Sequence, residues 1–235
     1  AFNPVFAERN VVNFFKGLPI LETKLRLGFI IDSQRFDVDN SRQRISDKEK
    51  TKGQLIKAFS ELVKVLKEIK VSDPHKFDYI YKAIAATKYQ EGEDFKYIKE
   101  AFQEVFVPFF EEFVLTSTGE YEKKENVRTF AEDYKVPLME IGINKYKWIA
   151  DSVEKDLHRH KVDVDSIDFS TLLSDADSTK LIALIKSVSA KDYNEFTKVS
   201  DIHKNEPEVL NNKIFRSNKG NLYSYNELKS TANIY

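Results

Sequence analysis

Two arginines, Arg42 and Arg44, are the residues whose type and spacing best suit chemistry with an anion. They stand two positions apart in a polar stretch, between a hydrophobic run that ends near Ile31 and an amphipathic run that begins near Lys52. A guanidinium group binds a phosphate or carboxylate through two parallel hydrogen bonds. A pair of arginines near a strand-to-helix junction therefore indicates an anion-binding site within residues 28–52.

The same arginines also have a structural interpretation. Four carboxylates lie close to them in the sequence and could pair with them to fix the turn: Asp32, Asp37, Asp39 and Asp47. In the functional interpretation, at least one arginine instead points at an anionic ligand that this chain does not carry alone. Both interpretations stay open at the level of sequence.

Other reactive or metal-binding side chains do not form a recognisable site. The stretch that starts at Asp37 begins like a calcium loop, but Arg42 stands where glycine is needed and Lys48 where glutamate is needed. His158 and His160 are two residues apart and diverge on a helix, so they predict a solvated helix end and not a metal site. No glycine-rich phosphate loop or Ser-His-Asp arrangement is visible. We therefore expect no catalytic residue and no metal ligand.

Composition excludes several classes of protein. The 235 residues are 41% hydrophobic and include 18 phenylalanines, which is typical of a folded chain. The net charge is −1, so we expect no nucleic-acid partner, although residues 1–70 alone carry 14 lysines and arginines against 9 acidic residues. No apolar run approaches the roughly 18 residues that cross a bilayer, which predicts no membrane partner. The absence of cysteine excludes thiol chemistry and favours a cytoplasmic location.

Residues 1–70 are predicted to form a small strand-strand-helix unit. Short apolar runs broken by glycine and proline indicate strands between residues 11 and 31. The alternating residues Leu25, Leu27, Phe29 and Ile31 predict one buried face. From about Lys52 to Lys70 the period becomes helical. The stripe expected to face the core comprises Leu55, Ala58, Phe59, Leu62, Leu66 and Ile69.

Residues 71–205 are predicted to form a helical subdomain. Asp73 as N-cap and Pro74 at the first helical position start one helix. The next helix carries a phenylalanine stripe, has Pro108 inside it and ends at 116–119. A short helix and an extended run are expected over 120–142, a helix over 144–159, a polar loop over 163–177, and helices near 178–189 and 191–200. The inward residues of the first two helices are Phe77, Ile80, Tyr81, Ile84 and Ala85, then Phe95, Ile98, Phe102, Val105, Phe106, Phe109 and Phe113.

Residues 206–235 are predicted to form a β-hairpin, with a turn at 218–220, and a short helix begun by Asn226. The chain as a whole is thus expected to be an α+β protein, mostly helical. Its expected parts are the transducer-like unit 1–70, the helical subdomain 71–205 and the closing segment 206–235.

Two segments resemble a known superfamily. The run RFDVDNSRQRI, from Arg35 to Ile45, resembles the segment that follows the nucleotide-binding domain of GHKL-type ATPases, and FKGLPI, from Phe15 to Ile20, resembles the strand motif that precedes it. The run IFRSNKGNLYSYNEL at 214–228 is similar to a phrase of the sacsin-like members. The superfamily also includes the large heat-shock chaperones and the mismatch-repair and gyrase ATPases. Its own ATP motifs, a Glu and Asn pair and a D-x-G-x-G loop, are absent from this chain.

The resemblance implies a non-catalytic middle or transducer region of a multidomain, chaperone-like ATP-binding protein. In the family a lysine or arginine of this region reaches the γ-phosphate, and Arg42 and Arg44 are the nearest matches, with Lys52 third. ATP and Mg would then be bound by an upstream ATPase domain of the same polypeptide, and no cofactor by this chain alone. The start at Ala1, without methionine, favours a piece of a longer protein.

Two other functions are weighed against this one. The alternative is a stand-alone helical protein-interaction module with no nucleotide role, in which the arginines are structural. An independent hydrolase is disfavoured because no acid/base or nucleophile arrangement is visible. The client protein is not indicated by any motif.

Overall fold

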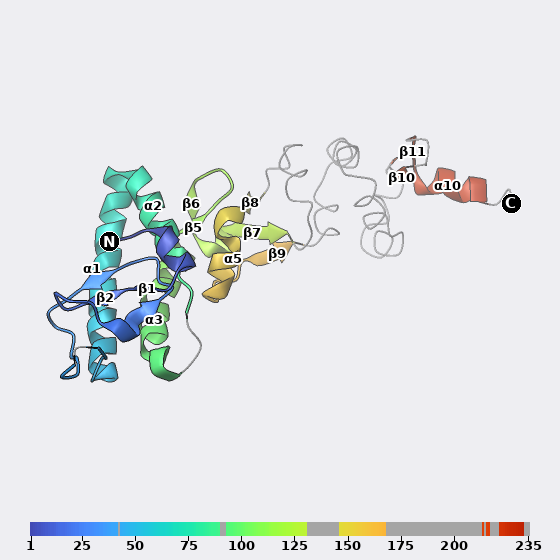
Figure 1. The fold of residues 1–235 in the computed structure, drawn as a ribbon. Helices are drawn as coiled ribbons and strands as arrows, with labels where there is room; N and C mark the ends of the chain where they lie inside the picture. The colour runs from blue at the N-terminus through green and yellow to red at the C-terminus, as the bar shows by residue number, and fades with distance from the viewer. Residues whose placement is uncertain are drawn as a thin grey trace. The chain divides into compact units, whose positions relative to one another are not determined.

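The computed structural model describes residues 1–41, 43–89, 93–130, 146–167, 213, 215–216 and 221–232. Contacts divide the chain into two compact units. Unit 1 comprises Ala1–Lys124 and Ile149–Asp163, and unit 2 comprises Glu125–Trp148 and Val164–Tyr235. The fold is α+β with more helix than strand, and it has an N-terminal strand-and-helix arrangement, as the sequence predicts (Figure 1).

The described residues of unit 1 form short strands, α-helices and short 3-10 helices. The strands are β1 (Val11–Val12), β2 (Phe14–Phe15), β3 (Lys24–Leu25), β4 (Ile31–Asp32), β5 (Val114–Leu115) and β6 (Tyr121–Glu122). The helices are α1 (Lys48–Ser72), α2 (Pro74–Ala85), α3 (Lys96–Glu112) and α5 (Asp151–Arg159), with the 3-10 helices η1 (Pro4–Glu8), η2 (Leu21–Thr23) and η3 (Glu93–Phe95). The boundary predicted between residues 70 and 71 falls inside this unit, close to Asp73, which separates α1 from α2.

A buried asparagine joins the N-terminal strands. β1 pairs with β3 in antiparallel fashion, and β2 pairs with β4 in parallel. Between them Asn13 is fully buried, accepts a hydrogen bond from the Leu25 amide at 3.1 Å, and donates to the carbonyls of Leu27 and Phe29 at 3.3 and 2.7 Å. These side-chain bonds satisfy backbone groups that two-residue strands leave unpaired.

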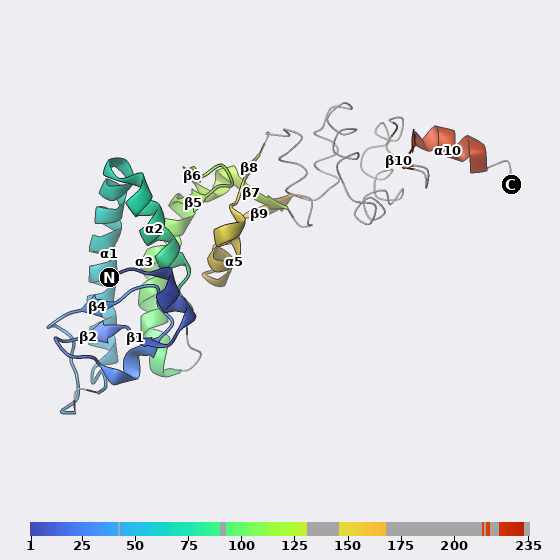
Figure 2. The same ribbon diagram turned by 45° about the horizontal axis from the view of Figure 1, so that its top comes forward.

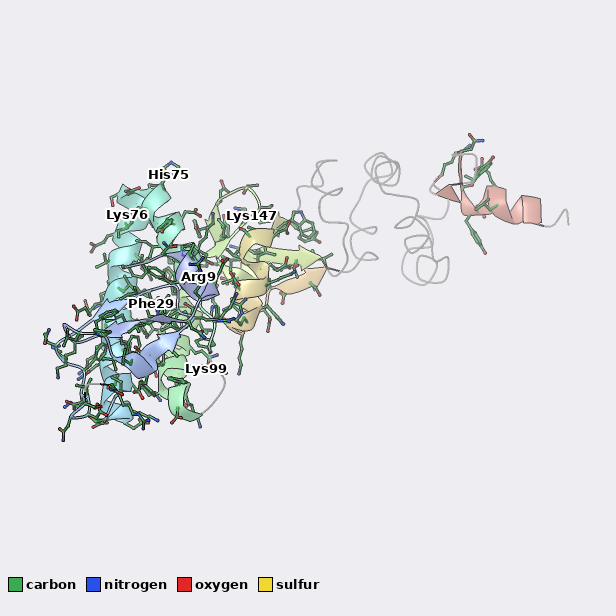
Figure 3. The ribbon with its side chains drawn as sticks, in the orientation of Figure 1. Arg9, Phe29, His75, Lys76, Lys99 and Lys147 are labelled. Carbon is green, nitrogen blue, oxygen red and sulfur yellow. The ribbon has the colours of Figure 1, made fainter. Side chains whose placement is uncertain are left out.

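The predicted buried face of the strand region is largely confirmed. Leu25, Leu27 and Phe29 are buried, whereas Ile31 is only partly covered. The ring of Phe29, labelled in Figure 3, lies 5.6 Å from that of Phe59 on α1 and 6.2 Å from that of Phe102 on α3. The strand layer therefore packs on the helices through aromatic contacts. Figure 2 shows the N-terminal strands beside α1 and α3.

Helix α1 is longer than its hydrophobic stripe predicts. It begins at Lys48, because the carboxylate of Asp47 caps it by accepting from the Lys50 amide at 2.9 Å. Leu55, Phe59 and Leu66 are buried as expected. Ala58 is exposed, however, and Leu62 and Ile69 are only partly buried, so the predicted core stripe was wrong at Ala58.

Helices α2 and α3 complete the core of unit 1. Asp73 caps α2 through the Lys76 amide and Pro74 is its first residue, and the five residues predicted to face inward are buried. α1 and α3 run side by side in the same direction, because Lys48, Lys52 and Lys67 pair in order with Asp94, Glu100 and Glu112 (Figures 1 and 2). On α3, Ile98, Phe102, Phe106 and Phe109 are buried, as are Tyr97, Ala101 and Phe110, which the sequence stripe omits.

The chain beyond α3 differs from the prediction. α3 ends at Glu112, and residues 116–119 form the turn of the β5–β6 hairpin, with Gly119 at φ +86°. The helix expected over 144–159 begins only at Asp151. Residues 147–150 are instead extended, since Lys147 and Trp148 form β8, Ile149 bridges Thr116 and the Ala150 amide donates to the Leu115 carbonyl at 2.9 Å.

Unit 2 holds a small parallel sheet and the C-terminal hairpin. β7 (Val127–Phe130) lies between β8 (Lys147–Trp148) and β9 (Asp165–Ile167). β8 replaces part of the helix predicted over 144–159, and β9 replaces part of the loop predicted over 163–177. The 3-10 helix η4 (Lys124–Asn126) marks the junction of the two units. β10 (Phe215–Arg216) and β11 (Leu222–Tyr223) pair in antiparallel fashion, which confirms the hairpin.

Helix α10 (Tyr225–Ala232) begins one residue before the predicted Asn226. Ser224 and Glu227 form a capping box, in which the Ser224 amide donates to the Glu227 carboxylate at 2.7 Å and the Glu227 amide to the Ser224 hydroxyl at 3.3 Å. The helices predicted near 178–189 and 191–200, the extended run within 131–142 and the turn at 218–220 lie outside the described residues.

Candidate functional site

The polar stretch that the sequence singled out forms a closed, exposed turn from Asp39 to Arg44, here called the arginine turn. A bridge between Val38 and Ile45 closes its base, and the Asp39 amide donates to the Arg44 carbonyl at 3.0 Å. The Asp39 carboxylate accepts from the amides of Gln43 and Arg44 at 2.9 and 3.3 Å. The hydroxyl of Ser41, these two amides and, to a smaller extent, the charge of Arg44 lower the pKa of Asp39. The turn is therefore held by its own hydrogen bonds.

Two contacts anchor the arginine turn to the rest of unit 1. The Glu22 amide donates to the Gln43 carbonyl at 3.0 Å, and the Glu22 carboxylate accepts from the Ile45 amide. On the other side, Lys50 of α1 pairs with Asp37 at 2.5 Å, which lowers the pKa of that carboxyl. An exposed turn is thus fixed in position at both ends.

The three predicted phosphate-sensing residues are placed differently. Arg42 lies outside the described residues. Arg44 is exposed, and within the described part of the chain its guanidinium has no ion-pair partner. Lys52 is partly buried against α3, where its amine pairs with Glu100 at 2.5 Å and its pKa is raised. The structure does not bring Lys52 and the arginine turn to a common ligand position.

A groove lies beside the arginine turn, and sequence reasoning did not find it. This α1 groove has a volume of about 630 Å³, within the range of ligand sites. Its lining comes from two segments, β4 with the loop that follows it and the first half of α1. The residues that line it are Ile31, Ser33, Arg35, Phe36, Glu49, Lys50, Gly53, Gln54, Leu55, Lys57, Ala58 and Glu61.

Two cations of the α1 groove are free to bind. Arg35 from the loop and Lys57 from α1 have no ion-pair partner within the described residues, whereas Lys50 is held by Asp37. The loop is tied to the helix, because the Gln54 amide group donates to the Arg35 carbonyl at 2.9 Å. Gly53 was the available signal in the sequence, since glycine inside a helical pattern lowers helix stability and calls for a reason.

A buried histidine is a second feature that the sequence did not predict. His160 is fully buried, which makes the predicted solvated helix end wrong at this residue. Its Nε2–H donates to the Ala85 carbonyl at 2.7 Å, so its Nδ1 accepts from the Tyr89 hydroxyl at 2.9 Å. The signal was its spacing, because Val153, Leu157 and His160 lie on one helical stripe. His158 by contrast is exposed, 2.6 Å from Asp163.

We expect the stability of unit 1 to fall as the pH drops from about 6.5 to 4. Burial lowers the pKa of His160 from 6.5 to about 4, with smaller effects of Arg159 and Asp156. Between these values the unfolded chain binds a proton that the folded chain excludes, and above 6.5 both forms are neutral. The shift corresponds to a loss of about 3 kcal/mol of unfolding free energy. Urea unfolding at several pH values would measure it.

The control for this pH effect is His160→Phe, which fits an aromatic environment made by Phe102, Phe110 and Tyr89. Carboxylates whose pKa is lowered, such as those of Asp37 and Glu100, also lose stabilising contacts in acid. The His160→Phe variant retains these carboxylates, so it shows the same acid-induced loss from them. The His160 contribution is therefore the difference between the two chains. An identical decline in both chains would contradict it.

The described residues hold no group of three or more His, Asp or Glu that could bind a metal. None of the described helices is long and apolar enough to cross a membrane. Comparison of the chain with models of known protein families gave no match, and comparisons with curated proteins and with solved structures gave none either.

Proposed function

We propose that this chain is a non-catalytic middle or transducer region of a multidomain, GHKL-type, chaperone-like ATP-binding protein. Its arginine turn contacts a phosphate group of the nucleotide that the upstream ATPase domain binds with Mg. The conformational change that follows ATP hydrolysis is then transmitted through α1 to a protein partner. A cytoplasmic location belongs to the same proposal.

One observation carries the proposal: all four aspartates that could have neutralised the arginines make other contacts. The carboxylates of Asp32 and Asp47 accept from the amides of Gly17 and Lys50, at 3.0 and 2.9 Å. Asp37 binds the Lys50 amine, and Asp39 binds amides and a hydroxyl within the turn. The more distant Asp94, which also feels the charge of Arg44, is paired with Lys48 at 2.8 Å.

This arrangement favours binding over a structural role for Arg44. A fixed backbone that presents an exposed guanidinium loses little conformational freedom when it takes an anion. Lys52 is assigned a structural role in the proposal, because its pairing with Glu100 joins α1 to α3. Arg44 and Arg42 are then the residues that reach the phosphate.

We expect Arg44→Ala to leave the isolated chain as stable as before, within about 0.5 kcal/mol, because the side chain is exposed and unpaired among the described residues. In the full-length protein the same change should slow ATP turnover by about tenfold or more, since a charge-assisted hydrogen bond to the reacting phosphate is lost. Arg44→Lys should restore turnover only in part, because lysine lacks the bidentate fork. Thermal melting and steady-state turnover measure the two effects.

Lys64→Ala is the matched control for this pair of measurements. Lys64 is an exposed cation of α1 whose partner is Glu61, and the proposal gives it no phosphate contact. The turnover of this variant should match that of the unmodified protein. A stable Arg44→Ala chain with unchanged turnover in the full-length protein would contradict nucleotide sensing and leave the interaction module as the function.

The stand-alone interaction module remains the second candidate function. The α1 groove favours it, because the groove offers apolar and charged side chains together. The two functions differ in whether the coding sequence extends upstream into a domain with a D-x-G-x-G loop. That observation separates them without any assay.

A further inference from the structure

The α1 groove has no part in the proposed nucleotide sensing, and its features indicate a separate binding site. Ala58, on the helical stripe where the sequence predicts core, is exposed there. Gly53 is also in open surroundings, since a Cβ added to it would meet no atom within 4 Å. Nothing in the packing of the described residues explains why a 25-residue helix keeps a glycine at this position.

The charges of the α1 groove fit a single anionic group. Arg35 and Lys57 are its cations without partners among the described residues, and they come from its two lining segments. Glu49 and Glu61 also line it, but Glu61 is paired with Lys64, so the uncommitted lining charges are these two cations against Glu49. The small positive excess suits one carboxylate, whereas a polyphosphate or nucleic acid would bring several negative charges close to Glu49 and be repelled. One carboxylate placed between Arg35 and Lys57 would be bound without that cost.

The dimensions of the α1 groove fit an extended chain. Its lining on α1 runs from Glu49 to Glu61, about 18 Å at a rise of 1.5 Å per residue. That length accommodates about five or six extended residues. Ile31 and Ala58 offer apolar surface along it, and Gly53 permits the close approach of a backbone.

We propose that the α1 groove binds an extended segment of a partner protein that carries one glutamate or aspartate between apolar residues. The acidic side chain lies between Arg35 and Lys57, and the apolar neighbours pack on Ile31 and Ala58. A peptide is the expected occupant because the lining of the groove extends along about three turns of α1, has an excess of one uncommitted positive charge and includes apolar side chains between the charged ones. This site is independent of the arginine turn and of any nucleotide.

The test uses the peptide acetyl-Ser-Leu-Glu-Val-Ser-amide and its counterparts with glutamine or lysine at the centre. Titrated into the isotope-labelled chain, the glutamate peptide should shift the amide signals of Arg35, Gly53 and Ala58. The affinity of the glutamine peptide should be lower by a factor of about ten or more, because a charge-assisted hydrogen bond is lost. The lysine peptide should not bind. Arg35→Ala and Lys57→Ala should each weaken the glutamate peptide to a similar degree.

Two further variants separate binding from folding. Lys67→Ala removes an α1 lysine that pairs with Glu112 of α3, and because neither residue lines the groove it should leave binding unchanged. Gly53→Leu should fill the groove and abolish binding, while the chain melts no lower than before, because leucine is the better helix former.

Three results would overturn the proposal. The first is no saturable binding of the glutamate peptide below about 1 mM. The second is equal binding by the Lys57→Ala chain. The third is that acetate or inorganic phosphate produces the same shifts at the same affinity, which would make this a small-anion site. An unchanged result for Arg44→Ala in any of these titrations is expected, so failure of the nucleotide proposal would not affect this one.

Discussion

Gly28→Ala is expected to destabilise unit 1 by at least about 3 kcal/mol and to prevent folding at moderate temperature. A methyl group built on Gly28 would lie 1.5 Å from the carbonyl oxygen of Ala83 and 2.5 Å from its carbonyl carbon. Real Cβ atoms essentially never come within 3.0 Å of such atoms. Because the opposing atoms belong to the backbone of α2, no side-chain rotation relieves the clash.

The backbone on the other side of the clash is held as well. The Gly28 amide donates to the buried Thr87 hydroxyl at 3.1 Å, and its carbonyl accepts from the Asn3 amide at 3.0 Å. Separating the strand region from α2 would break these bonds and expose Phe29. The strand region and α2 therefore cannot move apart independently to relieve the clash. For this reason the expected loss of unfolding free energy exceeds that of an ordinary overpacked side chain.

The matched control is the same substitution at Gly53. In its open position on α1, alanine meets nothing within 4 Å, so Gly53→Ala should stabilise the chain by about 0.5–1 kcal/mol. Chemical unfolding of both variants measures the two effects on one scale. A Gly28→Ala chain that unfolds at the original denaturant concentration would mean that the strand region does not pack on α2 in this register.

Local signals account for what the sequence predicted well. The capping of α2 by Asp73 and Pro74 depends on residues within one turn, and its buried face follows from the 3.6-residue period. The antiparallel pairing of β10 with β11 likewise joins neighbouring segments. Each of these features is decided by residues close together in the chain, so pattern alone was enough.

Features that depend on distant partners were not predictable in this way. His160 is buried because Ala85 and Tyr89, more than 70 residues earlier, supply its hydrogen bonds. Residues 147–150 are extended because their partners lie on β5 and β7, which overrides the helical pattern that follows. Periodicity carries no information about such contacts.

In the candidate site, too, the features set by neighbouring residues were predicted and those set by distant contacts were not. The polar turn of Arg44 was found from residue type and spacing, but the separation of Lys52 from it depends on Glu100 of α3. The α1 groove could not be predicted, because Arg35 and Lys57 become neighbours of one cavity only when the loop packs along the helix.

Phe106→Ala is expected to destabilise unit 1 by about 3–5 kcal/mol. Phe106 is fully buried, and its ring centroid lies 5.1 Å from that of Phe59 and 4.6 Å from that of Phe102. Rings of Phe109 and Phe110 are also in contact with it. Rigid aromatic neighbours collapse poorly into a cavity, so the loss should lie at the upper part of the range for buried residues.

Two controls relate this loss to packing. Phe106→Leu keeps most of the volume and should cost clearly less than the alanine variant. Val71→Ala removes apolar atoms from a side chain that is 85% exposed at the end of α1, and it should change stability by no more than about 0.5 kcal/mol. If Phe106→Ala changed the unfolding free energy as little as Val71→Ala does, the register of α3 against α1 would be wrong. The ion pairs of Lys52 with Glu100 and Lys67 with Glu112 would then also be misplaced, because the same register aligns them.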